Sequence, residues 1–463
     1  MFEVVSIMSE SGVVFYQRVM FPILDRRRGT QSLARFAELS KSQWLKPGEI
    51  IDLQKKRLKV LIKHAYDNVP YYKRAFRERG LTPDDIKTKK DLHKLPIIDK
   101  NTVRDHFDEL KAANFRTWKP ILRTTGGTTG KPLRYFSDPG EHSVFWADLW
   151  RAWTWAGYEL GDRRATIGGS RPPSQGFSFG SFVRSRIMER SLSLSSFDVT
   201  PEAMAGHVEQ LRDFKPKIVR GYPSSLYLFA KYMKKNAVSG LGIESVISIS
   251  EQLYDHQRKA IEGAFGCPVF DNYGCPDGGV VASECEDHEY HLNSENAIVE
   301  IVKDGDVLGF GEEGEIVSTN LVRLAMPFIR YKTGDMAVAS DEESRCGRGL
   351  EMLSSLMGRT SGYFVLSDGA LLAGVNLAAV FNEISSEIHI KQYQVVQESR
   401  GEATVLIVED VGFDRSDRDL ISNSLYEHTQ GKLAVEVRSV DDIPLTEAGK
   451  RRSFISKLGV GLE

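Results

Sequence analysis

RTTGGTTGKPL, residues 123–133, holds four threonines, three glycines and one lysine in eleven positions. Glycine lets the backbone turn where a Cβ would collide, so successive N–H groups and threonine hydroxyls can face one anion. Lys131 adds a positive charge, and we predict a phosphate-binding loop here. It is not a Walker loop, because the spacing GxxxxGK[ST] is absent and Pro132 cannot lie inside the helix that a Walker lysine opens. A polar surface turn is the alternative for this stretch alone.

Three further stretches follow in order: DNYGCPD (271–277), RYKTGD (330–335) and PLTEAGK (444–450). With residues 123–133 they resemble the motifs of the adenylate-forming enzymes, the superfamily of acyl-CoA synthetases, firefly luciferase and peptide-synthetase adenylation domains. Within it the chain most resembles phenylacetate-CoA ligase and its relatives in capsular polysaccharide biosynthesis, along nearly its whole length. The resemblance implies an ATP- and Mg²⁺-dependent ligase that activates a carboxylic acid as an acyl-adenylate and transfers the acyl group to CoA or an amine.

The expected fold class is α/β, and 463 residues are too many for one ordinary core. Between residues 200 and 270, predicted strands at 218–220, 246–249 and 269–270 alternate with helices, which favours a parallel, helix-covered sheet. From residue 297 onward, strands alternate with Gly and Asp turns, which favours an antiparallel subdomain. We expect a large N-terminal adenylate-forming domain over 1–357 and a small, mobile α+β domain over 358–463, with Ser416 capping a helix of the small domain.

Two helical patterns precede and follow the glycine-rich stretch. Residues 51–69 place apolar side chains at spacings of seven, four, three and four, which predicts one buried face made of Ile51, Leu58, Ile62, Ala65 and Val69. Tryptophans at 146, 150 and 153 follow a helical stripe, so helix core is favoured over an aromatic wall for a flat substrate.

The resemblance assigns most nucleotide contacts. It places the β and γ phosphates at Thr124, Thr125, Gly126, Gly127, Thr128, Thr129, Gly130 and Lys131. It places adenine at Ser250, Glu251, Asp271, Asn272, Tyr273 and Gly274, with Tyr273 stacking on the ring. Asp335 would accept both ribose hydroxyls. Asp277 stands where the family has a glutamate that binds Mg²⁺, one methylene longer, and Pro276 replaces a hydroxyl residue that contacts the α-phosphate.

The resemblance also gives the catalytic residues Lys450, Arg359 and Thr128. Lys450 lies on a Gly-containing loop, where the family's lysine bridges the carboxylate and the α-phosphate. Arg359 follows Gly358 at the expected hinge, and rotation of the small domain would present Lys450 for adenylation. Arg330 is expected to reach phosphate.

A second group concerns metal. Cys285, His291 and Cys346 resemble a zinc site of some phenylacetate-CoA ligase relatives, in which a second cysteine stands at the position of Ser344. A structural zinc site takes four ligands, so Cys275, His288 or a water would complete it. Bound zinc and free thiols are both left open.

Composition limits the partners. A net charge of −2 argues against nucleic-acid binding, no run reaches the eighteen or so apolar residues of a membrane helix, and four cysteines favour the cytoplasm. Small-molecule partners are expected, and the oligomeric state, homodimer included, is open. An adenylyltransferase that leaves AMP on its substrate and a non-catalytic nucleotide-binding protein of polysaccharide biosynthesis are the competing functions.

Overall fold

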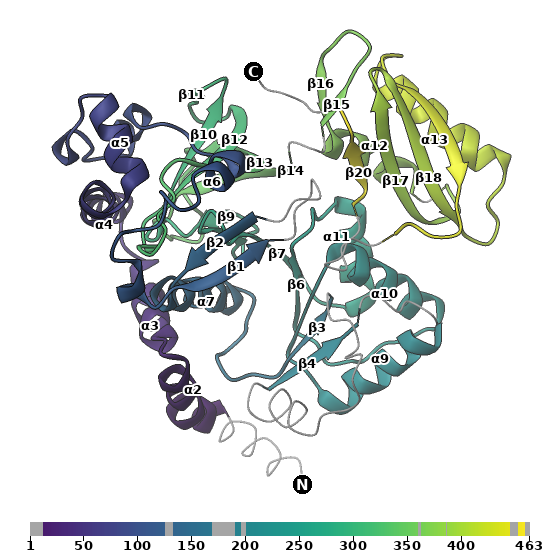
Figure 1. Cartoon of the computed structure of the whole chain (residues 1–463). Coiled ribbons are helices and arrows are strands. Elements are labelled where there is room, and N and C mark those ends of the chain that lie inside the picture. Colours follow the sequence, from purple (N-terminus) through teal and green to yellow (C-terminus); the bar gives the residue numbers. More distant parts are fainter. Residues whose placement is uncertain are drawn as a thin grey trace. The chain divides into compact units, whose positions relative to one another are not determined.

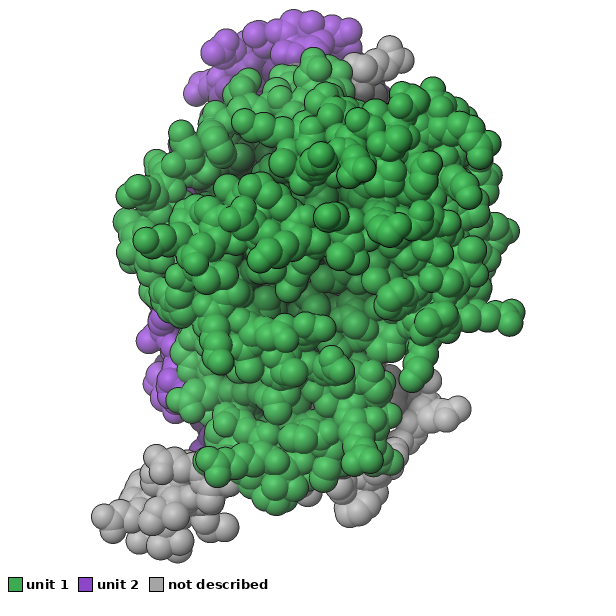
Figure 2. Space-filling model, turned by 90° about the vertical axis from the view of Figure 1, so that its left-hand side faces the viewer, with its two compact units in different colours: residues 1–162, 272–333, 337–356 green, residues 163–271, 334–336, 357–463 purple. Residues whose placement is uncertain are grey.

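The computed structural model (Figure 1) describes residues 13–125, 133–168, 190–195, 201–359, 363–385, 387–444 and 452–458. The chain divides into two compact units, coloured separately in Figure 2. The first comprises residues 1–162, 272–333 and 337–356, and the second comprises 163–271, 334–336 and 357–463. None of the described helices is long and apolar enough to cross a membrane.

The first unit starts with helices and continues with mainly antiparallel strands. Its helices are α2 (Phe21–Arg28), α3 (Ser32–Ser42), α4 (Pro47–Asn68), α5 (Pro70–Glu78), α6 (Lys100–Asp105) and α7 (Pro139–Trp155), with a 3-10 helix η3 (Lys89–Lys94). Its strands are β1 (Ile121–Thr125), β2 (Leu133–Ser137), β8 (Val280–Glu284), β9 (Tyr290–Leu292), β10 (Ala297–Lys303), β11 (Asp306–Val307), β12 (Glu313–Asn320) and most of β13 (Tyr331–Ser340) and β14 (Met352–Arg359).

These strands confirm the predicted antiparallel subdomain. Their order is β11-β10-β12-β13-β14-β9-β8. β10 pairs with β12 from Ala297 opposite Asn320 to Val302 opposite Glu315, and β8 pairs with β9. β1 and β2 form a separate two-stranded hairpin.

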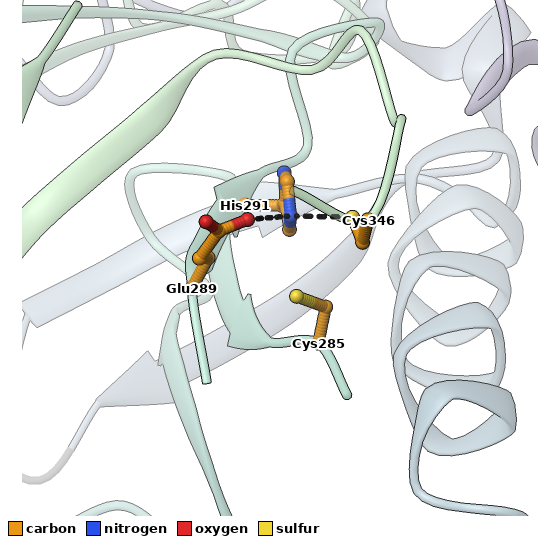
Figure 3. Close-up of side chains that lie close together, drawn as sticks. All are labelled: Cys285, Glu289, His291 and Cys346. Atoms are coloured by element: carbon orange, nitrogen blue, oxygen red, sulfur yellow. Dashed lines mark hydrogen bonds and ion pairs between the residues drawn. The ribbon is translucent and has the colours of Figure 1, made fainter. Parts of the chain in front are cut away.

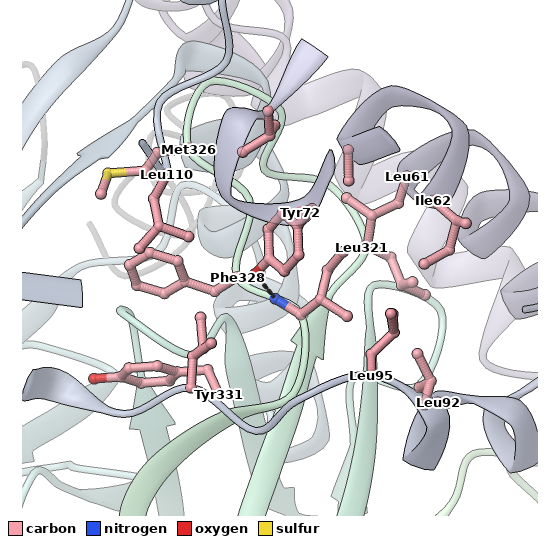
Figure 4. Close-up of a cluster of buried hydrophobic side chains, with 14 of the residues drawn as sticks. Leu61, Ile62, Tyr72, Leu92, Leu95, Leu110, Leu321, Met326, Phe328 and Tyr331 are labelled. Carbon is pink, nitrogen blue, oxygen red and sulfur yellow. Dashed lines mark hydrogen bonds between the residues drawn. The ribbon is translucent and has the colours of Figure 1, made fainter. Parts of the chain in front are cut away.

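One core of the first unit lies between α4, α5 and the end of β12 (Figure 4). Leu58, Leu61 and Ile62 of α4 are at most 1% exposed. The buried Tyr72 hydroxyl of α5 accepts the Ile329 N–H at 2.8 Å. The prediction that Ile51 shares this buried face is wrong, because the face begins at Ile50 and Ile51 is 45% exposed.

Helix α7 confirms the tryptophan prediction. The Asp138 side chain caps it by accepting the Glu141 N–H at 2.9 Å. Trp150 and Trp153 are buried, and the half-buried Trp146 lies 6.1 and 6.4 Å from their rings. The aromatic stripe is therefore helix core.

The second unit contains the alternating segment as predicted. Its elements are β3 (Arg164–Ile167), β4 (Ser191–Leu194), α9 (Pro201–Phe214), β5 (Ile218–Gly221), α10 (Pro223–Lys235), β6 (Ser245–Ile249) and α11 (Asp255–Phe265). The strands β6, β5, β3 and β4 are neighbours in that order and run parallel. β7 (Val269–Cys275) is five residues longer than the predicted strand 269–270, and it begins in this unit and ends in the first.

The C-terminal part of the second unit has an α+β architecture. Its elements are β15 (Tyr363–Val365), β16 (Leu371–Ala373), α12 (Gly374–Ile384), β17 (Ile390–Ser399), β18 (Glu402–Glu409), α13 (Arg415–His428), β19 (Ala434–Ser439) and β20 (Phe454–Ser456). Four of the strands form a sheet in the order β19-β18-β17-β20. The predicted cap Ser416 is wrong: Asp414 caps α13, accepting the N–H groups of Ser416 and Asp417.

Candidate functional site

The glycine-rich stretch connects two antiparallel strands. Thr124 pairs with Arg134 and Thr125 with Leu133 across the β1–β2 hairpin, and the Thr124 side chain is exposed. A Walker loop would lead from a strand into a helix, whereas here a strand follows. The loop residues themselves lie outside the described residues, namely Gly126, Gly127, Thr128, Thr129, Gly130 and Lys131.

The DNYG stretch occupies the second half of β7. Asp271 and Asn272 are buried, Tyr273 is half-buried and Gly274 is exposed. The Asn272 side-chain amide donates to the Ser283 hydroxyl on β8, which fixes its orientation. This strand therefore presents a half-buried tyrosine and an exposed glycine next to two buried polar residues.

Asp277 lies in the turn between β7 and β8 and is buried. Its Oδ2 accepts the Tyr331 hydroxyl at 2.6 Å, and its Oδ1 lies 3.3 Å from Cys275 Sγ. Burial raises the pKa of Tyr331, so that its hydroxyl keeps the proton that it donates. Each carboxylate oxygen retains acceptor capacity, as a Mg²⁺ ligand requires.

A buried arginine fixes the same turn. Arg323 donates at 2.7 Å to both the Pro276 and the Asp277 carbonyl oxygens, and it forms an ion pair with Glu141 of α7. The Asn320 amide also donates to Glu141, at 2.9 Å. Sequence reasoning missed Arg323, because no motif contains it.

Two further predicted adenine contacts follow β6, at the carboxyl end of a parallel strand. Ser250 has a left-handed backbone with φ of 69°, and Glu251 accepts the Ser224 N–H at 3.1 Å. The hydroxyls of Ser224 and Ser248 are buried and have no hydrogen-bond partner among the described residues. Unsatisfied buried hydroxyls are uncommon in native structures, and a bound polar ligand would satisfy them.

The structure describes the remaining predicted nucleotide-binding residues only in part. Asp335 is buried on β13. Arg359 ends β14, but its side chain lies outside the described residues, as does all of Lys450. Gly358 has φ of 82°, and a Cβ there would lie 2.9 Å from the Gln252 side-chain oxygen, so the predicted hinge position requires glycine.

Arg330 corrects one expectation. Its guanidinium is 3% exposed and donates to Glu300 at 3.0 Å and to the Leu95 carbonyl oxygen at 3.0 Å. The expectation that it reaches phosphate is wrong, because its charge is already paired inside the first unit.

A metal-ligand cluster lies in the first unit, at the loops around β9 (Figure 3). Cys285, Glu289, His291 and Cys346 each offer one ligand atom, and these atoms all lie within 4.8 Å of one another. His291 Nε2 lies 3.2 Å from Cys346 Sγ and 4.0 Å from Glu289 Oε2. Three of the four were predicted, and they meet as expected.

The donor set fits zinc. Burial lowers the pKa of His291 to about 4, so that its imidazole is neutral and can coordinate. Burial raises the pKa of the Cys285 thiol to about 12, and a bound cation would instead favour its thiolate. Two sulfurs, one imidazole nitrogen and one carboxylate oxygen are accepted ligands of tetrahedral zinc.

Glu289, rather than Cys275 or His288, accompanies the three predicted ligands. Cys275 lies against Asp277, and His288 pairs with Glu284 at 3.1 Å. A signal was present in the sequence: Glu289 and His291 are two residues apart at the start of a strand, a spacing that puts side chains on one face.

Comparisons with known proteins give relatives along most of the chain. Residues 364–457 match the family model described as the CapK C-terminal domain. The phenylacetate-coenzyme A ligase of Thermus thermophilus is 27% identical over 340 residues, which cover 70% of this chain and 72% of that protein. Protein CapK of Staphylococcus aureus is 23% identical over 421 residues, which cover 89% of this chain and 90% of that protein.

Among solved structures, a 2-hydroxyisobutyryl-CoA ligase in the postadenylation state superposes with a TM-score of 0.69 at 18% identity, covering 89% of this chain and 91% of that one. This likeness establishes a shared fold. Four ordered motifs, a shared fold and relatives along most of the sequence make this chain similar to the phenylacetate-coenzyme A ligases and to protein CapK.

Proposed function

We propose that the protein is an AMP-forming ligase that activates a small carboxylic acid with ATP and transfers the acyl group to CoA or an amine. The observation that carries this proposal is the placement of the phosphate-loop stretch between β1 and β2, in a chain related to phenylacetate-coenzyme A ligase over 70% of its length. In the first half-reaction a carboxylate oxygen attacks the α-phosphorus of ATP, and pyrophosphate leaves.

The chain's own residues would hold the nucleotide. The threonine hydroxyls and backbone N–H groups of residues 124–131 bind the β and γ phosphates, and Lys131 offsets their charge. Tyr273 stacks on adenine beside Glu251, and Asp335 accepts from the ribose. Asp277 holds Mg²⁺, which supplies charge neutralisation at the phosphates when it is bound.

Lys450 is the proposed catalytic cation. An ammonium at the α-phosphate stabilises negative charge that develops during the attack, and Arg359 and Thr128 act beside it. We propose that residues 358–463 form a mobile domain turning at Gly358, which brings Lys450 to the nucleotide for adenylation and withdraws it for acyl transfer. In that second half-reaction the acceptor attacks the acyl carbon, and AMP leaves.

The zinc cluster is proposed to be structural. Four protein ligands leave no open position for a substrate, which distinguishes structural from catalytic zinc sites. A zinc ion would join the loops on either side of β9 to the loop before β14. Its ligands would be Cys285, Glu289, His291 and Cys346. The predicted cytoplasmic location stays a prediction, and it suits free thiols that bind metal.

Pyrophosphate exchange tests the activity. The purified protein is incubated with ATP, Mg²⁺ and labelled pyrophosphate, together with a panel of aryl, aryl-acetic and short aliphatic acids. A ligase gives exchange that depends on the acid, and free AMP appears once CoA or an amine is added. AMP retained covalently on the substrate would indicate the adenylyltransferase, and absence of exchange with every acid would indicate a non-catalytic nucleotide-binding protein.

A further inference from the structure

A broad groove on the first unit is lined by none of the motif residues. It has a volume of about 1240 Å³, and its lining comes from α4, η3, the region of β10 and β11, and segment 339–353. Small-molecule pockets usually measure about 300–1,000 Å³. The groove is therefore large enough to receive side chains of another protein.

Exposed apolar side chains line both walls of the groove. The helical wall, made by α4, η3 and the residues just before α4, carries Trp44 and Ile51, which are 53% and 45% exposed. The strand wall, made by β11, the turn after it and residues 339–344, carries Val307 and Phe310, which are 47% and 64% exposed. Apolar groups exposed together in one hollow mark an interaction surface rather than scattered surface residues.

The helical wall is held in place. The Arg348 guanidinium lies 4.7 Å from the Trp44 ring and 4.7 Å from the buried Trp155 ring, between the two. Lys89 of η3 pairs with Glu351 at 2.9 Å, and both residues line the groove. A rigid aromatic group loses little conformational entropy when a partner covers it.

The two walls carry opposite charge. On the helical wall Lys46 and Lys90 are exposed, and neither has an ion-pair partner within the described ranges. On the strand wall Asp341, Glu342 and Glu343 are exposed and likewise lack one among the residues that the structure describes. The Gly311 N–H donates to the Ala339 carbonyl oxygen at 3.0 Å, which ties the turn of Phe310 to this acidic segment.

We propose that this groove is the interface of a symmetric homodimer. A two-fold axis running along a groove places each wall of one copy against the opposite wall of the other. Lysines 46 and 90 of each copy then face acidic residues 341–343 of its partner, and Phe310 meets Trp44 and Ile51. Both contacts occur twice, and the surface is complementary to itself in charge and in apolar character.

Charge reversal tests the two-fold arrangement directly. One variant reverses the acidic wall (Glu342→Lys with Glu343→Lys), and a second reverses the basic wall (Lys46→Glu with Lys90→Glu). In a homodimer of either variant, both pairs of facing walls would carry charges of the same sign. We therefore expect the dimer dissociation constant of each variant to rise at least about tenfold. An equimolar mixture of the two variants pairs opposite walls, and a heterodimer forms. The fourfold variant exchanges both walls, and dimerisation returns.

Analytical ultracentrifugation of the full chain over a range of concentrations measures these states. Asp108→Lys is the matched control, because Asp108 is exposed, lies in the same unit and does not line the groove; its dimer should equal the wild type. Phe310→Ser tests the apolar contact and should also weaken association. A circular dichroism spectrum and a melting temperature equal to those of the wild type show that each variant is folded, whatever its activity.

Three results would overturn the proposal. A wild-type chain that is monomeric at every concentration means that the groove binds a different partner or none. A dimer that neither charge reversal nor Phe310→Ser weakens uses another surface. Failure of the mixed variants to associate, when each is folded, rules out wall-to-wall pairing about a two-fold axis.

Discussion

At the scale of single residues, Arg323 shows how a side chain outside every motif can support one. Its guanidinium is fully buried, donates to two carbonyl oxygens of the Pro276–Asp277 turn and pairs with Glu141. The rings of Tyr135 and Phe328 lie 4.6 and 4.9 Å from its guanidinium carbon. Removing this charge leaves the Glu141 carboxylate buried and uncompensated.

We therefore expect Arg323→Met to lower the free energy of unfolding by about 3–5 kcal/mol. Chemical denaturation of the whole chain measures this free energy for both variants. Arg438→Met is the control: that exposed arginine pairs with Glu436 on the surface, where water screens the two charges, so its loss should change the free energy of unfolding much less. If both variants lose the same small amount of unfolding free energy, Arg323 does not hold the turn.

Glu289 belongs to the same scale. If it completes the zinc site, then Glu289→Ala should reduce the metal content of the purified protein, and a chelator should lower the melting temperature of the wild type more than that of the variant. Its neighbour Asp287 is exposed and lies outside the cluster, so Asp287→Ala should bind metal as the wild type does. Equal zinc in all three proteins would show that Glu289 is not a ligand.

Motif residues could be predicted from the sequence, but their partners could not. Arg330 stands in a motif, and a positive charge there suggested a phosphate contact. In the structure it pairs with Glu300 of β10, thirty residues earlier in the chain, and β12 lies between β10 and β13 in the sheet. Such a pairing depends on how β10, β12 and β13 align, which no local pattern states.

At the scale of elements, the turn from Pro276 to Gly279 joins β7 to β8 and carries the proposed magnesium ligand. Gly279 has φ of 72°, and a Cβ at this position would lie 2.2 Å from the Asn320 side-chain nitrogen. Asn320 in turn donates to Glu141, the partner of Arg323. The turn is thus packed against the network that holds it.

Gly279→Ala should cost about 1–3 kcal/mol in backbone strain and weaken nucleotide binding, because Asn320 must move. Gly263→Ala on α11 is the control, since no atom lies within 4 Å of the position that its new methyl group would occupy and alanine favours helices. Thermal unfolding and ATP titration compare the two. Equal melting temperatures would contradict the packing argument.

Element types were predictable where the periodicity was strong. The helices expected between the strands at 218–220, 246–249 and 269–270 are α10 and α11, so the alternation of strands and helices from 218 onward is confirmed. Ile51 was misplaced, because both Ile50 and Ile51 fit the start of a helical stripe, and only the packing of α4 shows which one faces inward. The exposed Ile51 instead lines the groove.

At the scale of the whole molecule, sequence indicated the family but not the grouping of its segments. Residues 163–271 form one compact unit with 357–463, far apart in the chain, and contacts such as the 2.9 Å bond from Lys231 to the Ile390 carbonyl oxygen join them. The boundary at 357/358 and the mobility of the last domain remain predictions.

Lys450 is proposed to act on a nucleotide held by the threonine–glycine loop. The most direct test is acid-dependent pyrophosphate exchange by the wild type, Lys450→Ala and Lys457→Ala, with ATP binding measured alongside; Lys457 is an exposed lysine of the same region that pairs with Glu398. We predict that Lys450→Ala lowers exchange by about 100-fold or more while ATP binding changes little, and that Lys457→Ala leaves both unchanged. Wild-type exchange by Lys450→Ala would contradict the account.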